Sequence, residues 1–272
     1  MKFLIALASF VAAVAAGPRC SAPEPSEWLL KQSATFAKEA KANPSIASSM
    51  VAQAIVVPTY FHVVRAGTAV TQGNIPDSQL TAQLDAMNSH FSGSGISFRL
   101  MATTRTTNSN WYNDNNESAM KAALRQGGYD ALNVYFYNLS GGTLGFCYFP
   151  VANPSASQLN LDGCSVLYTS VPGGTATNYN QGKTLTHEVG HYMGLYHTFQ
   201  GGCSTTNDGV SDTPAQRTST SGCPTTNPDT CPTMPGLDPI HNYMDYSYDS
   251  CMYEFTPQQI TRMNQFYTNY RL

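Results

Sequence analysis

The run HEVGHYMGLYH at residues 187–197 constrains this chain more than any other feature. On a helix, His187 and His191 project from one face, one turn apart. Gly194 tolerates the left-handed conformation that ends a helix, and the resulting turn lets His197 approach from another direction. Three neutral imidazoles leave one tetrahedral position for water, which is typical of a catalytic Zn²⁺ site rather than a structural one.

Glu188 is the candidate general base of this site. It lies about 100° around the helix from His187, so its carboxylate can reach the open metal position without being a ligand. A bare HExxH also occurs by chance on solvated helix faces, but Gly194 and His197 are further specified positions that argue against this alternative. The predicted chemistry is hydrolysis by a water that zinc activates and Glu188 deprotonates.

A second motif, NYMDYS, occupies residues 242–247. With the histidine run it makes the chain resemble the metzincin zinc metalloproteases, and more closely the pappalysin-like family with its secreted fungal members. The resembling stretches are TLTHEVGHYMGLYHTFQGGC, DGVSDTPAQ and NYMDYSYDSCMYEFTPQQITRM, within roughly the last ninety residues. The resemblance implies a secreted zinc metalloendopeptidase that takes protein or peptide substrates. A catalytically silent binding protein on the same fold is the alternative, but such loss usually damages the Glu or a ligand, and all are intact.

The resemblance also suggests roles for two residues of the second motif. Met244 matches the turn methionine that forms a hydrophobic floor under the zinc, a place that ordinary core packing would also explain. Tyr246 matches a tyrosine that in some metzincins lies near the metal and hydrogen-bonds the developing oxyanion. A buried tyrosine with a satisfied hydroxyl is the alternative for Tyr246.

The order of predicted elements fits an α+β fold of the metzincin type. In that fold a twisted, mostly parallel sheet packs with two long helices above the cleft, and a smaller irregular subdomain lies below. Pro58 predicts an edge position or a bulge for its strand, and residues 141–148 are the candidate edge that pairs with extended substrate. Periodicity and breakers predict helices at 28–42, 77–90, 116–126, 181–193 and 258–269, and strands at 54–64, 96–100, 132–137, 143–150 and 165–170.

The N-terminus has the composition of a secretory signal. One early lysine precedes the apolar run FLIALASFVAAVAA, which predicts a signal peptide over residues 1–16. The run is shorter than the about 20 residues that a membrane span needs. Residues 17–50 are predicted to be an N-terminal segment or a short pro-segment. Residues 51–272 are the predicted catalytic domain, with an upper subdomain at about 51–197 and a lower one at about 198–272.

Charge and hydropathy restrict the partners. Only 11% of residues are charged, the net charge is −3, and the basic residues form no cluster. Nucleic acid is therefore excluded as an expected partner, because phosphate binding needs clustered Lys and Arg. No later apolar run approaches membrane length, so the mature chain is expected to be extracellular, free of the membrane and monomeric.

Seven cysteines in a secreted chain predict disulfides. Cys147 and Cys164 could form one pair. The four that follow the histidine run allow three connectivities, and spacing alone does not choose among them. A pairing in which two bridges fasten the long irregular segment after the zinc helix is implied by the resemblance, namely Cys203–Cys231 and Cys223–Cys251.

Cys20 is left over from these pairs. It could be a free or pro-segment cysteine that caps the zinc before activation, since thiolates bind zinc well. The sequence favours a structural or intermolecular disulfide instead, because no switch-like motif surrounds Cys20.

The remaining candidates concern modification and further ions. Asn116 and Asn138 begin N-x-Ser sequons and are predicted glycosylation sites, Asn116 in the more exposed surroundings. Asp208 and Asp212, in DGVSDTP, could help bind a structural Ca²⁺, with an Asp-rich turn as the alternative. The other histidines are expected to be structural or solvated: His62, His90 and His241.

Overall fold

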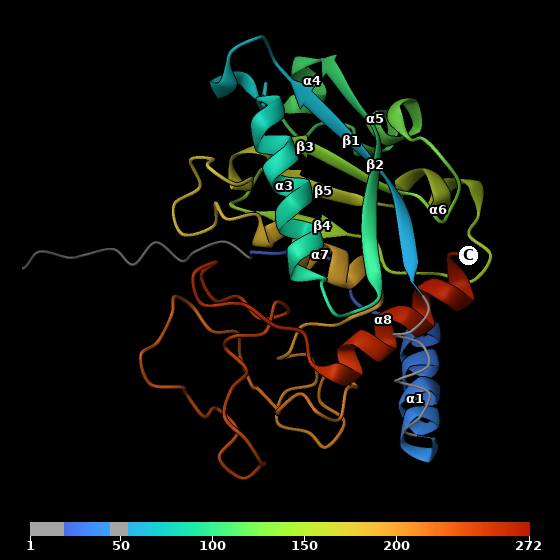
Figure 1. Cartoon of the computed structure of the whole chain (residues 1–272), viewed down its shortest axis with the longest axis vertical. Coiled ribbons are helices and arrows are strands. Elements are labelled where there is room, and N and C mark those ends of the chain that lie inside the picture. Colours follow the sequence, from blue (N-terminus) through green and yellow to red (C-terminus); the bar gives the residue numbers. More distant parts are fainter. Residues whose placement is uncertain (1–18, 44–53) are drawn as a thin grey trace, which may run out of the picture.

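The computed structural model describes residues 19–43 and 54–272 (Figure 1). The predicted signal peptide lies outside the described residues. Within them, no helix combines the length and the apolar character that crossing a membrane requires.

A sheet with strand order β2-β1-β3-β5-β4 forms the upper part of the molecule. Only β4 runs antiparallel to its neighbour β5, and the other pairs are parallel. The predicted mostly parallel sheet is therefore confirmed. Its strands are β1 (Ile55–Arg65), β2 (Ile96–Thr107), β3 (Leu132–Tyr137), β4 (Gly145–Cys147) and β5 (Cys164–Leu167).

Two helices, α3 and α7, pack against the sheet and against each other, as expected for the helices above the cleft (Figure 1). Leu80 and Met87 of α3 and Leu185 and Val189 of α7 join one buried cluster with Phe61 of β1. The helices are α1 (Glu27–Ala42), α3 (Asp77–His90), α4 (Ser109–Tyr112), α5 (Glu117–Leu124), α6 (Ala156–Leu161), α7 (Lys183–Tyr192) and α8 (Pro257–Tyr270), with 3-10 turns at Val70–Gln72 and Tyr168–Ser170.

The prediction that Pro58 places its strand at an edge is wrong, because β1 lies between β2 and β3. The alternative, a bulge, is confirmed: the register against β2 shifts between Thr59 and Tyr60. Pairing with β3 begins only at Thr59. Pro58 has no backbone N–H, but it precedes the residues that pair with β3. The β1–β3 ladder therefore loses no hydrogen bond at Pro58.

Several element bounds differ from the predicted ones. β2 continues to Thr107, because its pairing with β1 extends as far as Arg65 and Thr107. The strand predicted at 143–150 shrinks to β4, and the strand predicted at 165–170 gives way to a 3-10 turn after Leu167. Asn116 caps α5 through its side chain rather than belonging to it.

Residues 193–256 form the irregular lower part, with isolated turns and a single-residue bridge between Asn242 and Glu254. Two disulfides fasten this part, Cys203–Cys231 and Cys223–Cys251, which is the pairing that the resemblance implied. A third, Cys147–Cys164, joins β4 to β5. The terminal helix α8 then closes the chain.

Helix α1 lies beside α8 at the base of the molecule (Figure 1). Ser26 caps α1 through its side chain. Leu29 is fully buried, and the Phe36 ring meets the Phe266 ring edge to face. Helix α1 is thus packed onto α8, and residues 19–21, which precede it in the chain, lie against the sheet.

Candidate metal centre and active site

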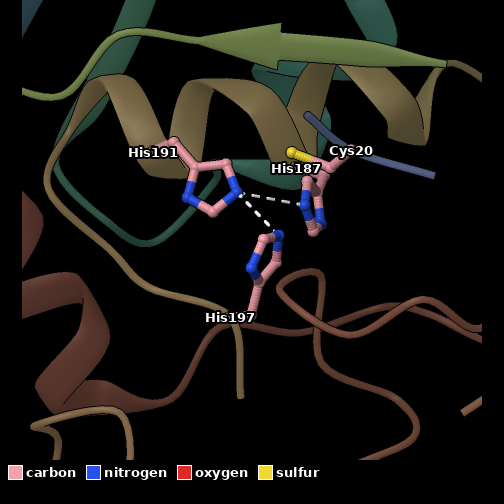
Figure 2. A group of neighbouring side chains, drawn as sticks. All are labelled: Cys20, His187, His191 and His197. Carbon is pink, nitrogen blue, oxygen red and sulfur yellow. Dashed lines mark hydrogen bonds between the residues drawn. The ribbon is translucent and has the colours of Figure 1, made fainter. Parts of the chain in front are cut away.

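Three histidines converge between the sheet and the lower part (Figure 2). Helix α7 presents His187 and His191 from one face, and the segment after α7 carries His197. The Nε2 atom of His191 lies 3.2 Å from Nε2 of His187 and 3.1 Å from Nε2 of His197. The three ring nitrogens therefore face a common point.

The hydrogen bonds of the opposite ring nitrogens fix the tautomers. Nδ1 of His187 donates to the Tyr243 carbonyl oxygen at 2.6 Å, and Nδ1 of His191 donates to the Leu195 carbonyl oxygen at 2.8 Å. The Nε2 atoms of these neutral rings carry lone pairs, so neither can donate a proton to the other. A cation at the common point satisfies all three nitrogens, and a buried three-imidazole set suits Zn²⁺.

The protonation state agrees with metal binding. Burial lowers the pKa of His191 to about 4. Burial, followed by the neighbouring histidines, lowers the pKa of His187 and His197 well below the ordinary value. All three rings are therefore neutral at pH 7, which is the state that a metal ligand needs.

Gly194 makes the turn that brings in the third histidine. Its φ of +91° lies in the left-handed region, and a Cβ there would lie 2.6 Å from the Phe266 ring. Below α7, the fully buried Met244 packs against the helix backbone at Gly190. Met244 therefore lies against the helix that carries His187 and His191, and it belongs to the main core as well.

Glu188 is buried beside the histidines. Burial raises the pKa of its carboxyl to about 8. A dication held by the three histidines would act in the opposite direction, because a nearby positive charge favours the carboxylate. The carboxylate accepts a hydrogen bond from Cys20 Sγ at 3.3 Å.

Cys20 is a free, buried thiol within this cluster (Figure 2). Its Sγ and the three histidine nitrogens all lie within 4.8 Å of one another. The prediction of a disulfide from Cys20 within this chain is therefore wrong, because the other six cysteines pair with one another. Backbone pairing brings Cys20 to this place: Leu144 N donates to the Arg19 carbonyl at 2.9 Å, and Ser21 N donates to the Gly145 carbonyl at 3.1 Å.

This pairing adds residues 19–21 to the free edge of the sheet. β4 is the edge strand, and it lies within the predicted substrate edge at 141–148. Cys20 bridges Gly145 in the parallel direction. A segment of the chain itself thus lies beside the edge strand and across the histidines.

Tyr246 lies on the other side of the histidines. Its hydroxyl is 3.2 Å from Nε2 of His197 and donates to the Cys20 carbonyl oxygen, also at 3.2 Å. The His197 ring stacks on Phe199 at 4.8 Å between centroids. Tyr246 therefore lies close enough to contact a peptide carbonyl at the site, because one is already bound to its hydroxyl.

Sequence reasoning missed the pocket that holds Arg19. The side chain of Arg19 is 5% exposed and forms an ion pair with Asp249 at 3.3 Å. It also donates to the carbonyl oxygen of Ser247 and lies under the Tyr179 ring. The walls of this pocket come from segments far apart in the chain, which sequence patterns do not bring together.

The other candidate residues lie outside the cluster. Asp208 accepts from Val210 N, and Asp212 accepts from Thr256 and Gln258 at the start of α8, as turn-forming and capping carboxylates do. Asp245 accepts from Thr220 N in the buried lower part. The remaining histidines each have local partners: His62 with Thr104 and Asn133, His90 with Thr186, and His241 with the Cys251 carbonyl.

Fold and site together define a metalloendopeptidase of the metzincin type. The peptidase M43 family model, described as pregnancy-associated plasma protein-A, matches residues 111–268. An extracellular metalloprotease of Colletotrichum graminicola is 51% identical over 98% of this chain and 96% of its own length. One from Podospora anserina is 49% identical over 100% of this chain and 99% of its own length. The chain therefore belongs to this metallopeptidase family.

Solved structures show the same architecture. Mature mirolysin of Tannerella forsythia, in complex with a cleaved peptide, is 29% identical with a TM-score of 0.65, over 78% of this chain and 90% of that one. A promirolysin mutant from the same organism is 28% identical with a TM-score of 0.70, over 93% of this chain and 95% of that one.

Proposed function

We propose that the chain is a secreted zinc endopeptidase in which Glu188 is the general base. The single observation that carries this proposal is the convergence of three unprotonated imidazole nitrogens beside one buried carboxylate. The relatives named extracellular metalloproteases support secretion and activity. The silent binding protein has no comparable support, because Glu188 and the three histidines are all present.

His187, His191 and His197 would hold the zinc. When bound there, Zn²⁺ supplies Lewis acidity, which polarises a carbonyl and lowers the pKa of a bound water toward about 7. Oε2 of Glu188 would accept the proton of the attacking water and return it to the leaving amine. The Tyr246 hydroxyl would donate to the carbonyl oxygen of the scissile bond, as it now donates to the Cys20 carbonyl.

The substrate would lie extended along β4. The pairing of Ser21 and Arg19 with this strand supports such a mode, because it uses the free backbone groups of the edge. The pocket that holds the Arg19 side chain supports a substrate with a basic side chain beside the scissile bond.

The N-terminal segment would keep the enzyme latent. Cys20 Sγ lies where it would be a fourth zinc ligand in place of water, and thiolates bind zinc well. Mature mirolysin aligns with 78% of this chain and promirolysin with 93%. This difference supports a pro-segment within residues 17–50, whereas the signal peptide at residues 1–16 and the catalytic domain at residues 51–272 stay predictions.

Three smaller proposals complete the description. Asn116 is exposed and Asn138 half-buried, which supports Asn116 as the better glycan acceptor. A structural Ca²⁺ near Asp208 and Asp212 stays a prediction, and so does the monomeric state. A melting temperature that chelation of calcium leaves unchanged would argue against the calcium ion.

The test compares the secreted chain with Glu188→Gln and with the control Glu254→Gln, an exposed glutamate of the same region. Hydrolysis of a denatured protein and zinc content by mass spectrometry are measured in all three. We expect Glu188→Gln to keep its zinc and lose at least about 100-fold in rate, since general base catalysis is worth that much or more. Wild-type rates in Glu188→Gln would contradict the proposal.

An inactive wild-type chain that contains zinc would have two explanations. Cys20→Ala separates them, because it removes the blocking thiol and leaves the histidines and Glu188 in place. Activity gained in Cys20→Ala indicates a latent peptidase. If a folded, zinc-loaded Cys20→Ala chain and a zinc-loaded chain freed of residues 17–50 are both inactive, the binding protein is supported.

A further inference from the structure

The pocket that holds Arg19 has an aromatic wall as well as an acidic one. We propose that Tyr179 is a specificity-determining residue through which this pocket selects arginine over lysine in the substrate. The inference rests on the proposed peptidase function, and it adds the discrimination between two side chains of the same charge.

The acidic wall is held rigidly. Asp249 Oδ2 accepts from Gln181 N at 2.8 Å, and Asp249 N donates to the Asn178 carbonyl at 2.9 Å. These bonds tie Asp249 to the loop before α7 and leave Oδ1 facing the guest side chain. Oδ1 lies 3.3 Å from Nη2 of Arg19.

The two terminal nitrogens of the guanidinium have different partners. Nη2 contacts Asp249, whereas Nη1 donates to the Ser247 carbonyl and lies 3.6 Å from the Met252 sulfur. Nε of Arg19 has no hydrogen-bond partner among the described residues. The pocket therefore contacts the two terminal nitrogens of the guanidinium through two separate acceptors.

Tyr179 covers the flat face of the same group. The Arg19 Cζ atom lies 4.9 Å from the centroid of the Tyr179 ring, within the range of a cation–π contact. The Tyr248 ring supports this ring edge to face at 5.5 Å, and Tyr179 N donates to the Ala176 carbonyl at 2.9 Å. The aromatic wall is thus held in place by its own loop and by the segment that carries Asp249.

Lysine cannot use these contacts in the same way. An ammonium has a single nitrogen, so it cannot contact Asp249 and the Ser247 carbonyl from two separate atoms. It also has no planar face for Tyr179 and is more strongly hydrated than a guanidinium. Asp249 attracts both cations, whereas Tyr179 favours the planar one.

The test uses two peptides that differ only by Arg or Lys beside the scissile bond. The kcat/KM ratio of Arg to Lys peptide is measured for the active enzyme, Tyr179→Leu, Tyr179→Phe and the control Tyr253→Leu, whose exposed ring stacks on His241. We expect Tyr179→Leu to lower the ratio about tenfold, and Tyr179→Phe and Tyr253→Leu to keep it.

An unchanged ratio in Tyr179→Leu would overturn the inference while leaving the peptidase function intact. Cleavage of neither peptide by the wild-type enzyme, together with no cleavage of a denatured protein, would instead overturn the proposed function.

A second readout needs no turnover. Cys20 is the free cysteine beside the three disulfides, so its labelling rate in the metal-stripped full chain reports release of residues 19–21. We expect Arg19→Lys to raise this rate about tenfold in the parent chain and less than about twofold in Tyr179→Leu. Equal increases in both chains would show that Tyr179 does not distinguish the two side chains.

Discussion

Gly190 lies where helix α7 meets the methionine beneath it. A Cβ at this position would lie 2.3 Å from the Met244 sulfur, and Met244 is fully buried. Gly190→Ala should therefore lower the free energy of unfolding by about 1–3 kcal/mol, the usual cost of overpacking a core. It should also weaken zinc binding, because His187 and His191 flank Gly190 on the same helix.

Chemical denaturation and zinc titration measure these two effects. Gly93→Ala is the comparison for zinc affinity alone. A Cβ there would meet nothing within 4 Å, but the φ of +83° strains an alanine, so this variant should lose some stability and keep the zinc affinity of the parent. Parental stability and zinc affinity in Gly190→Ala would show that Met244 does not pack as described.

His62 makes stability depend on pH away from the active site. Its ring is fully buried in β1, between Thr104 at 2.8 Å and Asn133 at 2.9 Å. Burial lowers the pKa of His62 from its ordinary value of 6.5 to about 4. Between these two values the unfolded chain binds a proton that the folded chain does not, so stability is complete above pH 6.5 and is lost as the pH falls below it.

The expected loss from His62 is about 2 kcal/mol between pH 7 and pH 5. Over this interval the free energy of unfolding of His62→Gln should fall by about 2 kcal/mol less than that of the wild type. Denaturation at both pH values measures this difference. The difference between the two proteins in this loss of stability cancels the contribution of the histidines that both contain. A wild-type loss no larger than that of His62→Gln would contradict the account.

At the scale of elements, strong local patterns predicted the structure well. The apolar run at 132–137 is β3, buried at every residue. Thr256, Pro257 and Gln259 start α8 with a capping box and a proline in the first turn, as their residue types indicate. The spacing of the histidine run placed His187 and His191 on one helix face, and the structure brings all three histidines together.

Strand lengths and strand order were less accessible from the sequence. β4 is three residues long, because its pairing partner β5 ends where the chain enters a 3-10 turn. Pro58 indicated an edge or a bulge, and the local pattern did not choose between them because it does not show where the pairing partners begin. Both features depend on contacts between separate segments, which periodicity does not encode.

Helix α1 packs against α8 and so holds the N-terminal segment to the rest of the chain. Leu29 is fully buried, whereas its neighbour Leu30 is 47% exposed. Leu29→Ala should weaken the docking of α1 by about 2–4 kcal/mol, the usual cost of such a truncation in a core. The full chain should then show a higher basal rate of peptide hydrolysis and faster labelling of Cys20.

Leu30→Ala is the matched control for α1, since it shortens the same side chain on the exposed face. We expect it to leave both rates unchanged. If Leu29→Ala behaves like Leu30→Ala, the docking of α1 does not contribute to latency.

At the scale of the whole molecule, disulfides fasten the part below the site, where there is little regular secondary structure. Cys203–Cys231 and Cys223–Cys251 each span 28 residues of irregular chain. Loop entropy predicts that removing either pair lowers the free energy of unfolding by about 3–4 kcal/mol. Cys251 lies between Asp249 and Met252, which both contact Arg19, whereas Cys203 lies on a different loop.

The double variants Cys203→Ser/Cys231→Ser and Cys223→Ser/Cys251→Ser therefore form a matched pair. Both should lose similar stability in denaturation, but only the second should also lose preference for the basic peptide. Equal preference in the two variants would show that the second disulfide does not hold the pocket.

The contact of residues 19–21 with β4 and the histidines was the part of the molecule least predictable from the sequence. Cys20 and Glu188 are 168 residues apart in the chain, and Arg19 and Asp249 are 230 residues apart. No switch-like motif surrounds Cys20. The sequence therefore does not show that residues 19–21 pair with β4, which is what brings Cys20 to its neighbours. The three histidines are close in sequence and their convergence was predictable, whereas residues 19–21, which lie beside them, are far away in the chain.

X-ray absorption at the zinc edge of the purified full-length chain tests the central claim most directly. The account predicts one zinc per chain with three nitrogen neighbours at about 2.0–2.1 Å and one sulfur at about 2.3 Å. Cys20→Ala should lose the sulfur and keep the three nitrogens. A zinc with several sulfur neighbours, or a chain that binds no zinc although His187, His191 and His197 are intact, would contradict it.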